Sequence, residues 1–197
     1  MIDFTPFITS IKLSLVTTVI LITISLPLGY LISFSRWRIK PVAESIINLP
    51  LVLPPTVIGF YLLLLFSPRF ALGGMLESVF NTRILFSFTG LVIASCRYSM
   101  PFMILSILYG MDQFDKSILD ASYSLGKSKA ETLLKIILPN IIPNIISGMV
   151  MTFAHTMGEF GVVLMIGGNI PGETKLASIA IYDKVEELDY ASAHIYS

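Results

Sequence analysis

Charged side chains are scarce in this chain of 197 residues: Lys, Arg, Asp and Glu make up 13% of it, whereas soluble domains usually carry about 25%. Hydrophobic residues make up 54%. The formal net charge is zero, so no basic excess indicates a nucleic-acid partner. The single cysteine, Cys96, excludes an internal disulfide, and no Cys/His spacing is typical of a zinc site. These deficits indicate that lipid is the main solvent of the chain.

Four apolar runs are long enough to cross a bilayer, because about 20 apolar residues of helix span a hydrocarbon core of about 30 Å. Residues 13–35 and 46–66 contain no charged side chain, residues 84–109 contain only Arg97, and residues 141–166 contain only Glu159. The predicted spans lie at about residues 11–35, 46–66, 84–109 and 141–166. We therefore predict an all-α polytopic membrane protein in which residues 1–197 form a single transmembrane domain.

Lysine and arginine favour the cytoplasmic side of a membrane. Seven of them lie between spans one and two or between spans three and four, and five lie on the other side. The seven are Arg36, Arg38, Lys40, Lys116, Lys127, Lys129 and Lys135, and the five are Lys12, Arg69, Arg83, Lys175 and Lys184. This bias predicts an outer N-terminus and a cytoplasmic segment at residues 112–140. Residues 191–197 turn apolar again, which predicts the first turns of a truncated fifth span after about residue 191.

Two adjacent prolines, Pro54 and Pro55, interrupt the second span. Proline lacks a backbone donor and clashes with the carbonyl four residues earlier, so this span must bend or begin late. Broken backbone at membrane depth persists only where protein or a cavity satisfies it. Both a kinked packing helix and a place on a transport pathway are compatible with this pattern.

The segment 112–140 carries helical signals of its own. Ser128 and Glu131 form a capping box, in which the serine hydroxyl bonds the Glu131 N–H and the glutamate returns the bond. Gly126 ends the preceding helical pattern as a left-handed cap, and Pro139 closes the following one. The segment is therefore predicted to fold as a helix, a glycine turn and a second helix.

The spacing of this segment resembles the cytoplasmic loop of ABC importer permeases. That family pattern is Glu-Ala-Ala, three residues, Gly, nine residues, Ile, one residue, Leu-Pro. The corresponding residues here are Asp120, Ala121, Ser122, Gly126, Ile136, Leu138 and Pro139. Asp for Glu and Ser for the second Ala are the two departures. The resemblance implies a MetI-like helical bundle whose residues 112–140, named the coupling loop below, dock on a separate ATP-binding subunit.

An ATP site within this chain is not expected. Residues 121–128 end like a P-loop, but Ala121 replaces the first glycine and no strand precedes the loop, so the phosphate cradle lacks its context. The chain is thus predicted to be no enzyme and to hold no cofactor, with ATP bound and hydrolysed by a partner subunit.

Two further stretches resemble molybdate permeases. The first is Leu49 to Phe66, and the second combines Gly158-Glu159-Phe160-Gly161 with Gly168-Asn169-Ile170-Pro171-Gly172. Sulfate and thiosulfate permeases share a similar second stretch, and molybdate permeases usually have Arg where this chain has His155. The resemblance implies import of molybdate or tungstate, with sulfate or thiosulfate as the alternative.

The same resemblance implies a set of partners in a bacterial or archaeal plasma membrane: a second copy of the chain, two ATP-binding subunits and an extracytoplasmic oxyanion-binding protein. A secondary transporter, a channel and an assembly factor are competing classes. Inverted repeats would favour the first of these, and no repeat relates the two halves of the sequence.

Ionisable residues inside spans cost about 2.5–3.5 kcal/mol each on insertion scales and usually face protein or a cavity. Arg97, His155 and Glu159 are therefore candidate pathway residues, together with Pro54 and Pro55. His155 and Glu159 are four apart and predicted to share a helix face. We expect a structural Arg97–Glu159 ion pair; in the alternative, Arg97 and His155 lower the barrier for a dianion. A His155–Glu159 metal site lacks a third ligand and is not expected.

Overall fold

The computed structural model describes residues 3–34, 40–70, 73–75 and 83–197. Every regular element in these ranges is a helix, which confirms the all-α prediction. The elements are α1 (Thr5–Ser33), α2 (Lys40–Val52), α3 (Pro55–Phe66), α5 (Phe88–Asp112), α6 (Lys116–Ser124), α7 (Lys129–Thr132), the π-helical turn η1 (Leu133–Ile137), α8 (Leu138–Asn140), α9 (Ile142–Gly158), α10 (Gly161–Gly167), α11 (Ala177–Glu186) and α12 (Tyr190–Tyr196).

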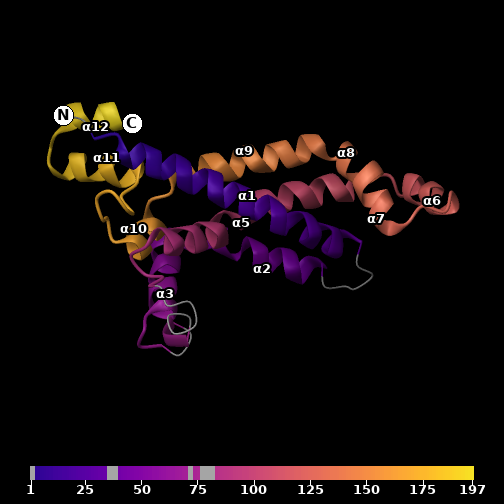
Figure 1. Ribbon diagram of the computed structural model, residues 1–197, viewed down its shortest axis with the longest axis horizontal. Coiled ribbons are helices and arrows are strands. Elements are labelled where there is room, and N and C mark those ends of the chain that lie inside the picture. The colour runs from indigo at the N-terminus through magenta and orange to yellow at the C-terminus, as the bar shows by residue number, and fades with distance from the viewer. Residues whose placement is uncertain (1–2, 35–39, 71–72, 76–82) are drawn as a thin grey trace.

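Three helices, α1, α5 and α9, lie side by side and form an elongated bundle (Figure 1). The face of α1 that enters the bundle is rich in small hydroxyl residues, and Ser10, Ser14 and Thr17 are fully buried on it. Small side chains let helix backbones approach closely. In a bilayer the hydrophobic effect does not drive helices together, so such close packing is a main source of their association. The bundle is therefore held by close packing on one side of α1.

A cluster of large apolar side chains fills the half of the bundle nearest the coupling loop. Met103 and Ile107 of α5 and Ile137 of η1 are at most 1% exposed, and Leu21 of α1 packs with them. Burying such side chains contributes about 1.5–3 kcal/mol each. This cluster packs the coupling loop against α1 and α5.

Two helices, α1 and α5, are long and apolar enough to cross a membrane by themselves. The predicted second span is divided into α2 and α3, which meet at 105°, so the predicted break at the proline pair is confirmed. The predicted fourth span corresponds to α9 and α10, which are separated at Glu159 and Phe160. A second bend of 69° lies between residues 129–140 and α9.

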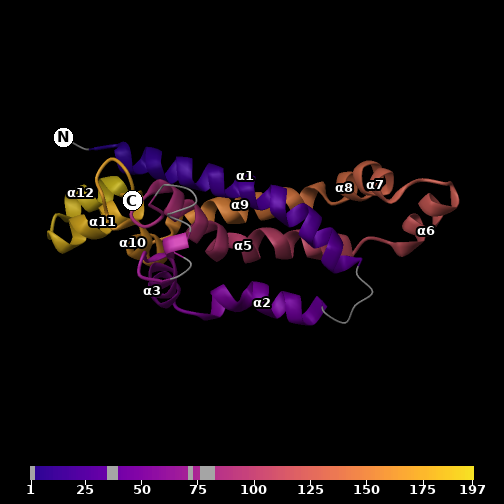
Figure 2. The same cartoon turned by 60° about the horizontal axis from the view of Figure 1, so that its bottom comes forward.

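The two ends of the bundle differ in content. Helices α10, α11 and α12 gather around the N-terminus at one end, and α6 and α7 project from the other (Figures 1 and 2). The predicted orientation also separates these two ends. Arg36 and Arg38, which contribute to that prediction, lie outside the described residues, as does the side chain of Lys116. The predicted orientation and the predicted fifth span after about residue 191 stay predictions.

Candidate functional site

The coupling loop begins with a capped helix. Asp115 is the N-cap of α6, and its Oδ1 accepts a hydrogen bond from the Ser117 N–H at 2.8 Å. Backbone donors at a helix start otherwise lack partners, so Asp115 satisfies one of them. The bonds from Ser117 hold the pKa of the Asp115 carboxyl below its usual range. The start of α6 is therefore defined by a cap that the sequence prediction did not identify.

The glycine turn after α6 has the predicted left-handed geometry. Gly126 has φ of +75°, and an added Cβ would meet nothing within 4 Å. The Lys127 N–H donates to the Ser122 carbonyl at 3.2 Å, and the Gly126 N–H donates to the Tyr123 carbonyl at 2.9 Å. These two bonds are the Schellman pattern that closes helix C-termini. The predicted cap at Gly126 is confirmed.

The second helix of the loop begins at the predicted capping residue. Ser128 Oγ accepts from the Glu131 N–H at 3.2 Å, which confirms the forward half of the capping box. The Glu131 carboxylate accepts instead from Lys135 at 2.9 Å and from Lys127 at 3.5 Å. Because a hydrogen bond from Lys135 and the charge of Lys127 favour the carboxylate, the pKa of Glu131 is lowered. Glu131 therefore joins the turn to α7 through charges.

A buried hydrogen bond locks the two halves of the loop together. Ser122 Oγ and Thr132 Oγ1 lie 2.8 Å apart, and both side chains are nearly or fully buried. Ser122 is the position where the family pattern has a second alanine, so the departure adds an interhelical bond. Asp120 and Ala121 of the same motif are exposed and available to a partner. Thr132 was missed in the sequence because nothing in its spacing marks a link to α6.

The remaining motif residues lie where the loop joins the bundle. Ile136 and Leu138 are half-buried and Pro139 is exposed. Pro139 lacks the N–H that an α-helix would direct to the carbonyl of Lys135. The π-helical turn η1 precedes this residue, and in it the Leu138 N–H donates to the Leu133 carbonyl five residues earlier. Turns of π-helix are rare in proteins, and those that occur are often found at functional sites.

Three of the five candidate pathway residues line one cavity. Its volume is about 500 Å³, and it lies where α3 begins and α9 ends. The lining residues are Pro55, Thr56, Tyr98, Ala154, His155, Gly158, Glu159, Phe160 and Gly161. Pro54 is the residue immediately before α3 and does not line it. The structure therefore brings together Pro55, from the proline pair, and His155 and Glu159, from the ionisable residues within spans.

His155 and Glu159 lie on the same side of α9, as their spacing of four predicts. Helix α9 ends at Gly158, and Glu159 follows with φ −65° and ψ 134°, so the chain leaves the helix only after the Glu159 side chain is placed. His155 contacts Ser99 and Glu159 contacts Ser95, one turn apart on α5. Both side chains line the cavity.

The predicted Arg97–Glu159 ion pair is wrong. Glu159 is 4% exposed and accepts a hydrogen bond from Ser95 Oγ at 3.0 Å. Arg97 is two residues beyond Ser95, which rotates it by about 200° around α5. Its side chain lines a different cavity of about 330 Å³ between α5 and the α2–α3 bend. The sequence places Arg97 within the third span but does not show which side of α5 it occupies.

Two serines that the sequence analysis missed connect α5 to α9 beside the cavity. Ser95 contacts Glu159, and Ser99, one turn later, contacts both His155 Nδ1 and Thr156 Oγ1 at 2.9 Å. Both serines are fully buried. Serine is common in membrane helices as a packing residue, so only the apposition of the two helices distinguishes this pair. Within the described residues, no group of three or more His, Cys, Asp or Glu could hold a metal.

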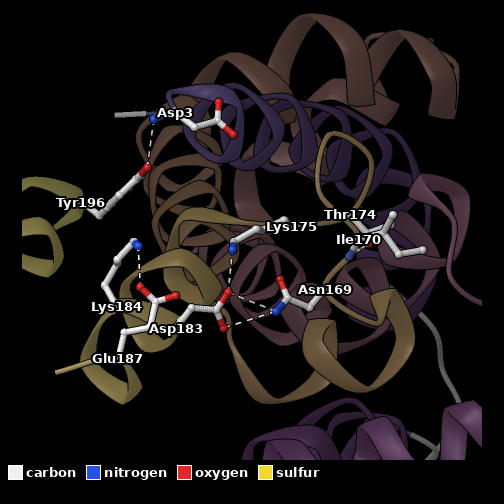
Figure 3. Close-up of polar contacts among 9 residues, drawn as sticks. All are labelled: Asp3, Asn169, Ile170, Thr174, Lys175, Asp183, Lys184, Glu187 and Tyr196. Carbon is white, nitrogen blue, oxygen red and sulfur yellow. Dashed lines mark hydrogen bonds and ion pairs between the residues drawn. The ribbon is translucent and has the colours of Figure 1, made fainter. Parts of the chain in front are cut away.

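The segment after α10 is held by its own polar contacts (Figure 3). Asp183 of α11 accepts from Lys175 at 2.5 Å and from Asn169 at 3.1 Å and 3.2 Å. Thr174, which is fully buried, donates to the Gly167 carbonyl at 2.6 Å and accepts from the Ile170 N–H at 3.0 Å. These contacts therefore hold the segment between α10 and α11 in place at this end of the bundle.

The family model for binding-protein-dependent transport system inner membrane components matches residues 25–192. The chain is 36% identical to the molybdenum transport system permease protein ModB of Azotobacter vinelandii, over 94% of this chain and 82% of that protein. It is 34% identical to the putative molybdenum transport system permease protein YvgM of Bacillus subtilis, over 91% of this chain and 79% of that protein.

A sulfate relative matches less of the chain. The probable sulfate transport system permease protein cysT of Chlorella vulgaris is 32% identical over 77% of this chain and 57% of that protein. The family match covers α5, α9, the coupling loop, the residues that line the cavity and the last part of α1. This chain therefore belongs to the family of binding-protein-dependent transport system inner membrane components.

Proposed function

We propose that this chain is the membrane-spanning permease subunit of an ATP-driven importer that carries molybdate, or tungstate, across the plasma membrane. The observation that carries the proposal is the match to molybdenum permeases over more than nine-tenths of the chain. The sulfate relatives match at lower identity, 32% and 29%. Molybdate and tungstate are nearly equal in size and charge, so one pathway serves both.

The coupling loop supplies the surface for a separate ATP-binding subunit. Asp120, Ala121 and Leu125 are exposed on it, and Leu125 is 78% exposed. Ile118 and Tyr123 of the same short segment are exposed as well, and several large apolar side chains exposed together are typical of a protein contact. The buried Ser122–Thr132 bond lets α6 and α7 move together when that partner moves.

The surroundings of Arg97 support pairing with a second copy. Its cavity is lined by apolar residues of α2 and α3 together with Tyr61, and in the described part of the chain Arg97 forms no ion pair. A cation turned toward lipid at this depth is costly, whereas one facing a protein-lined aqueous path is not. A second copy against this face would direct Arg97 toward the anion.

The arrangement supports transport by alternating access. A binding protein would deliver the anion at the end formed by α10–α12, and ATP-driven closure would act on α6 and α7 at the other end. Packing of Leu119 and Ile137 with the base of α5 carries that movement into the bundle. The break at Glu159 and the bend at Pro54 are the places where the helices change direction. ATP is bound and hydrolysed by the partner subunit.

Reconstitution in proteoliposomes tests the proposal. The permease is combined with its ATP-binding subunit and binding protein, and ATP hydrolysis and anion uptake are measured with molybdate, tungstate or sulfate. We expect stimulation by molybdate and tungstate and none by sulfate. Stimulation by sulfate alone would move the substrate to the alternative, and a permease that couples to no ATP-binding subunit would overturn the proposal.

Replacement within the coupling loop separates docking from substrate choice. Asp120→Lys reverses the charge of an exposed motif residue. The matched control is Glu186→Lys on α11, which is also exposed but lies at the opposite end of the bundle. We expect only the first variant to lose the ATP-binding subunit on purification.

A further inference from the structure

Ser99 and its neighbours form a buried chain of hydroxyls that ends on His155. Ser99 Oγ lies 2.9 Å from His155 Nδ1 and 2.9 Å from Thr156 Oγ1. Thr156 Oγ1 donates in turn to the carbonyl of Thr152 at 2.8 Å. Ser99 and Thr156 are both fully buried, so water does not supply either hydroxyl with another partner.

The hydrogens in this chain can be assigned one by one, because each hydroxyl carries a single hydrogen. A single arrangement makes all three contacts hydrogen bonds at once. In it the Thr156 hydroxyl donates to the carbonyl of Thr152, which can only accept, and Thr156 Oγ1 accepts the hydrogen of Ser99. Ser99 then has none left for His155, so the hydrogen between them belongs to Nδ1. His155 donates, and Ser99 accepts.

This assignment determines the state of the other ring nitrogen. In a neutral imidazole one nitrogen carries hydrogen and the other is an acceptor. With Nδ1–H bonded to Ser99, Nε2 of a neutral ring is bare. It has no hydrogen-bonding partner within the described ranges. The ring is half-buried, lines the 500 Å³ cavity, and is held between Tyr98 and Phe102 with centroids 5.0 Å and 4.3 Å away.

We infer that His155 offers a bare Nε2 to this cavity, so that an oxyanion is accepted beside it only together with a proton. The inference rests on the proposed function and adds proton coupling to it. A dianion has oxygen acceptors only, and these repel an unprotonated nitrogen. When Nε2 takes a proton from the outer aqueous phase, the ring becomes an imidazolium that keeps its Nδ1–H bond to Ser99. Nε2–H then donates to an anion oxygen, and one proton is bound for each anion.

Other titratable groups near the ring are few. Tyr98 of α5 and Glu159 after α9 line the same cavity, whereas α3 contributes Pro55 and Thr56, which do not titrate in this range. Arg97 lines a different cavity. Glu159 carries no positive charge in either protonation state, so it gives an anion no substitute for a proton on His155.

Nitrogen NMR tests the placement of the proton without any transport assay. The chain has two histidines, and the second, His194, is exposed on α12. In the assembled transporter in lipid, His194→Asn leaves one ¹⁵N-labelled ring in this subunit, and unlabelled partners contribute no signal. We expect neutral His155 to carry hydrogen on Nδ1, and Ser99→Ala to shift the population toward Nε2–H. A wild-type ring with hydrogen on Nε2 would overturn the inference.

The pH profile of uptake tests the coupling. For one linked proton, the molybdate concentration at half-maximal uptake should rise about tenfold per pH unit once His155 is neutral. His155→Arg, a permanent cation, should remove this slope, while His194→Asn and Glu159→Gln should keep it. If His155→Arg kept the slope, the proton would reside elsewhere and the coupling would be refuted. A wild-type complex that takes up no molybdate at any pH would overturn the proposed function, and the NMR result would still decide the proton's place.

Discussion

Ser95 Oγ on α5 donates a hydrogen bond to Glu159 Oε2 at 3.0 Å and so ties α5 to the break between α9 and α10. Glu159 is 4% exposed, and its second oxygen has no hydrogen-bonding partner in the described part of the chain. Its backbone is fixed as well, because the Ser178 hydroxyl donates to the Glu159 carbonyl at 2.6 Å. One residue thus connects α5, α9 and α11 at the edge of the cavity.

The first prediction concerns the donor in this contact. Ser95→Ala would leave a buried carboxyl without its donor, which costs about 1–3 kcal/mol. We expect a lower unfolding temperature of the purified permease in detergent. Ser106→Ala is the control on the same helix, because Ser106 bonds only the carbonyl of Phe102 within α5. Equal losses for both variants would show that the contact with Glu159 contributes nothing specific.

Local signals in the sequence account for much of the architecture. The proline pair at Pro54 predicts the bend of the second span, Gly126 predicts the turn, and Ser128 predicts the start of α7, and the structure has all three. Each depends on backbone chemistry within a few residues, which a single sequence displays.

The polar contacts around the cavity join segments that are far apart in the sequence, and for that reason they were not predicted. Helix α9 ends at Gly158 without a proline to mark the break, so the break before α10 was not predicted. Arg97 was expected at Glu159 because the sequence does not show which side of α5 faces α9. Ser95 and Ser99 resemble ordinary packing serines until α9 is placed beside them.

The second prediction tests the corrected position of Arg97. Arg97 and Glu159 line different cavities, so Arg97→Gln and Glu159→Gln should change stability additively, with a coupling below about 0.5 kcal/mol. The measurement is a double-mutant cycle of unfolding free energies in detergent. A coupling of several kcal/mol would restore the ion pair. Arg97→Gln should also reduce molybdate uptake while leaving assembly with the ATP-binding subunit intact.

The third prediction uses two glycines with matching backbone. Gly126 in the coupling loop has φ of +75° and Gly172 at the other end has φ of +79°, and neither would place a Cβ within 4 Å of another group. Alanine at such angles costs about 1–2 kcal/mol. Gly126→Ala should lower molybdate-stimulated ATP hydrolysis, and Gly172→Ala should leave it near wild type. Equal reductions would mean that the turn at Gly126 has no special part in coupling.

The fourth prediction concerns the cap of α6 and its pH dependence. Because Ser117 lowers the pKa of Asp115, the cap is intact above the unfolded pKa of about 3.9 and is lost as pH falls through the lower folded value. Asp115→Ala should speed amide exchange in the first turn of α6 at neutral pH, because the first backbone donors of the helix lose their acceptor. Asp115→Asn, which keeps an acceptor, should remain protected even at acid pH. Exchange unaffected by Asp115→Ala would show that docking rather than the cap orders this helix.

The fifth prediction concerns the close approach of α3 and α10 beside the cavity. A Cβ on Gly59 would lie 2.9 Å from Met165 Cβ and 3.1 Å from Val162 Cα. A backbone atom cannot move aside as a flexible side chain can, so Gly59→Ala must force the two short helices apart, at about 1–3 kcal/mol. Gly158→Ala is the matched control for stability, since nothing lies within 4 Å of its added methyl. Thermal unfolding should therefore separate the two variants by several degrees. Equal unfolding temperatures for Gly59→Ala and Gly158→Ala would contradict this prediction. They would mean that α10 can shift on α3 without loss of stability, so that the contact between the two helices can slide during the transport cycle.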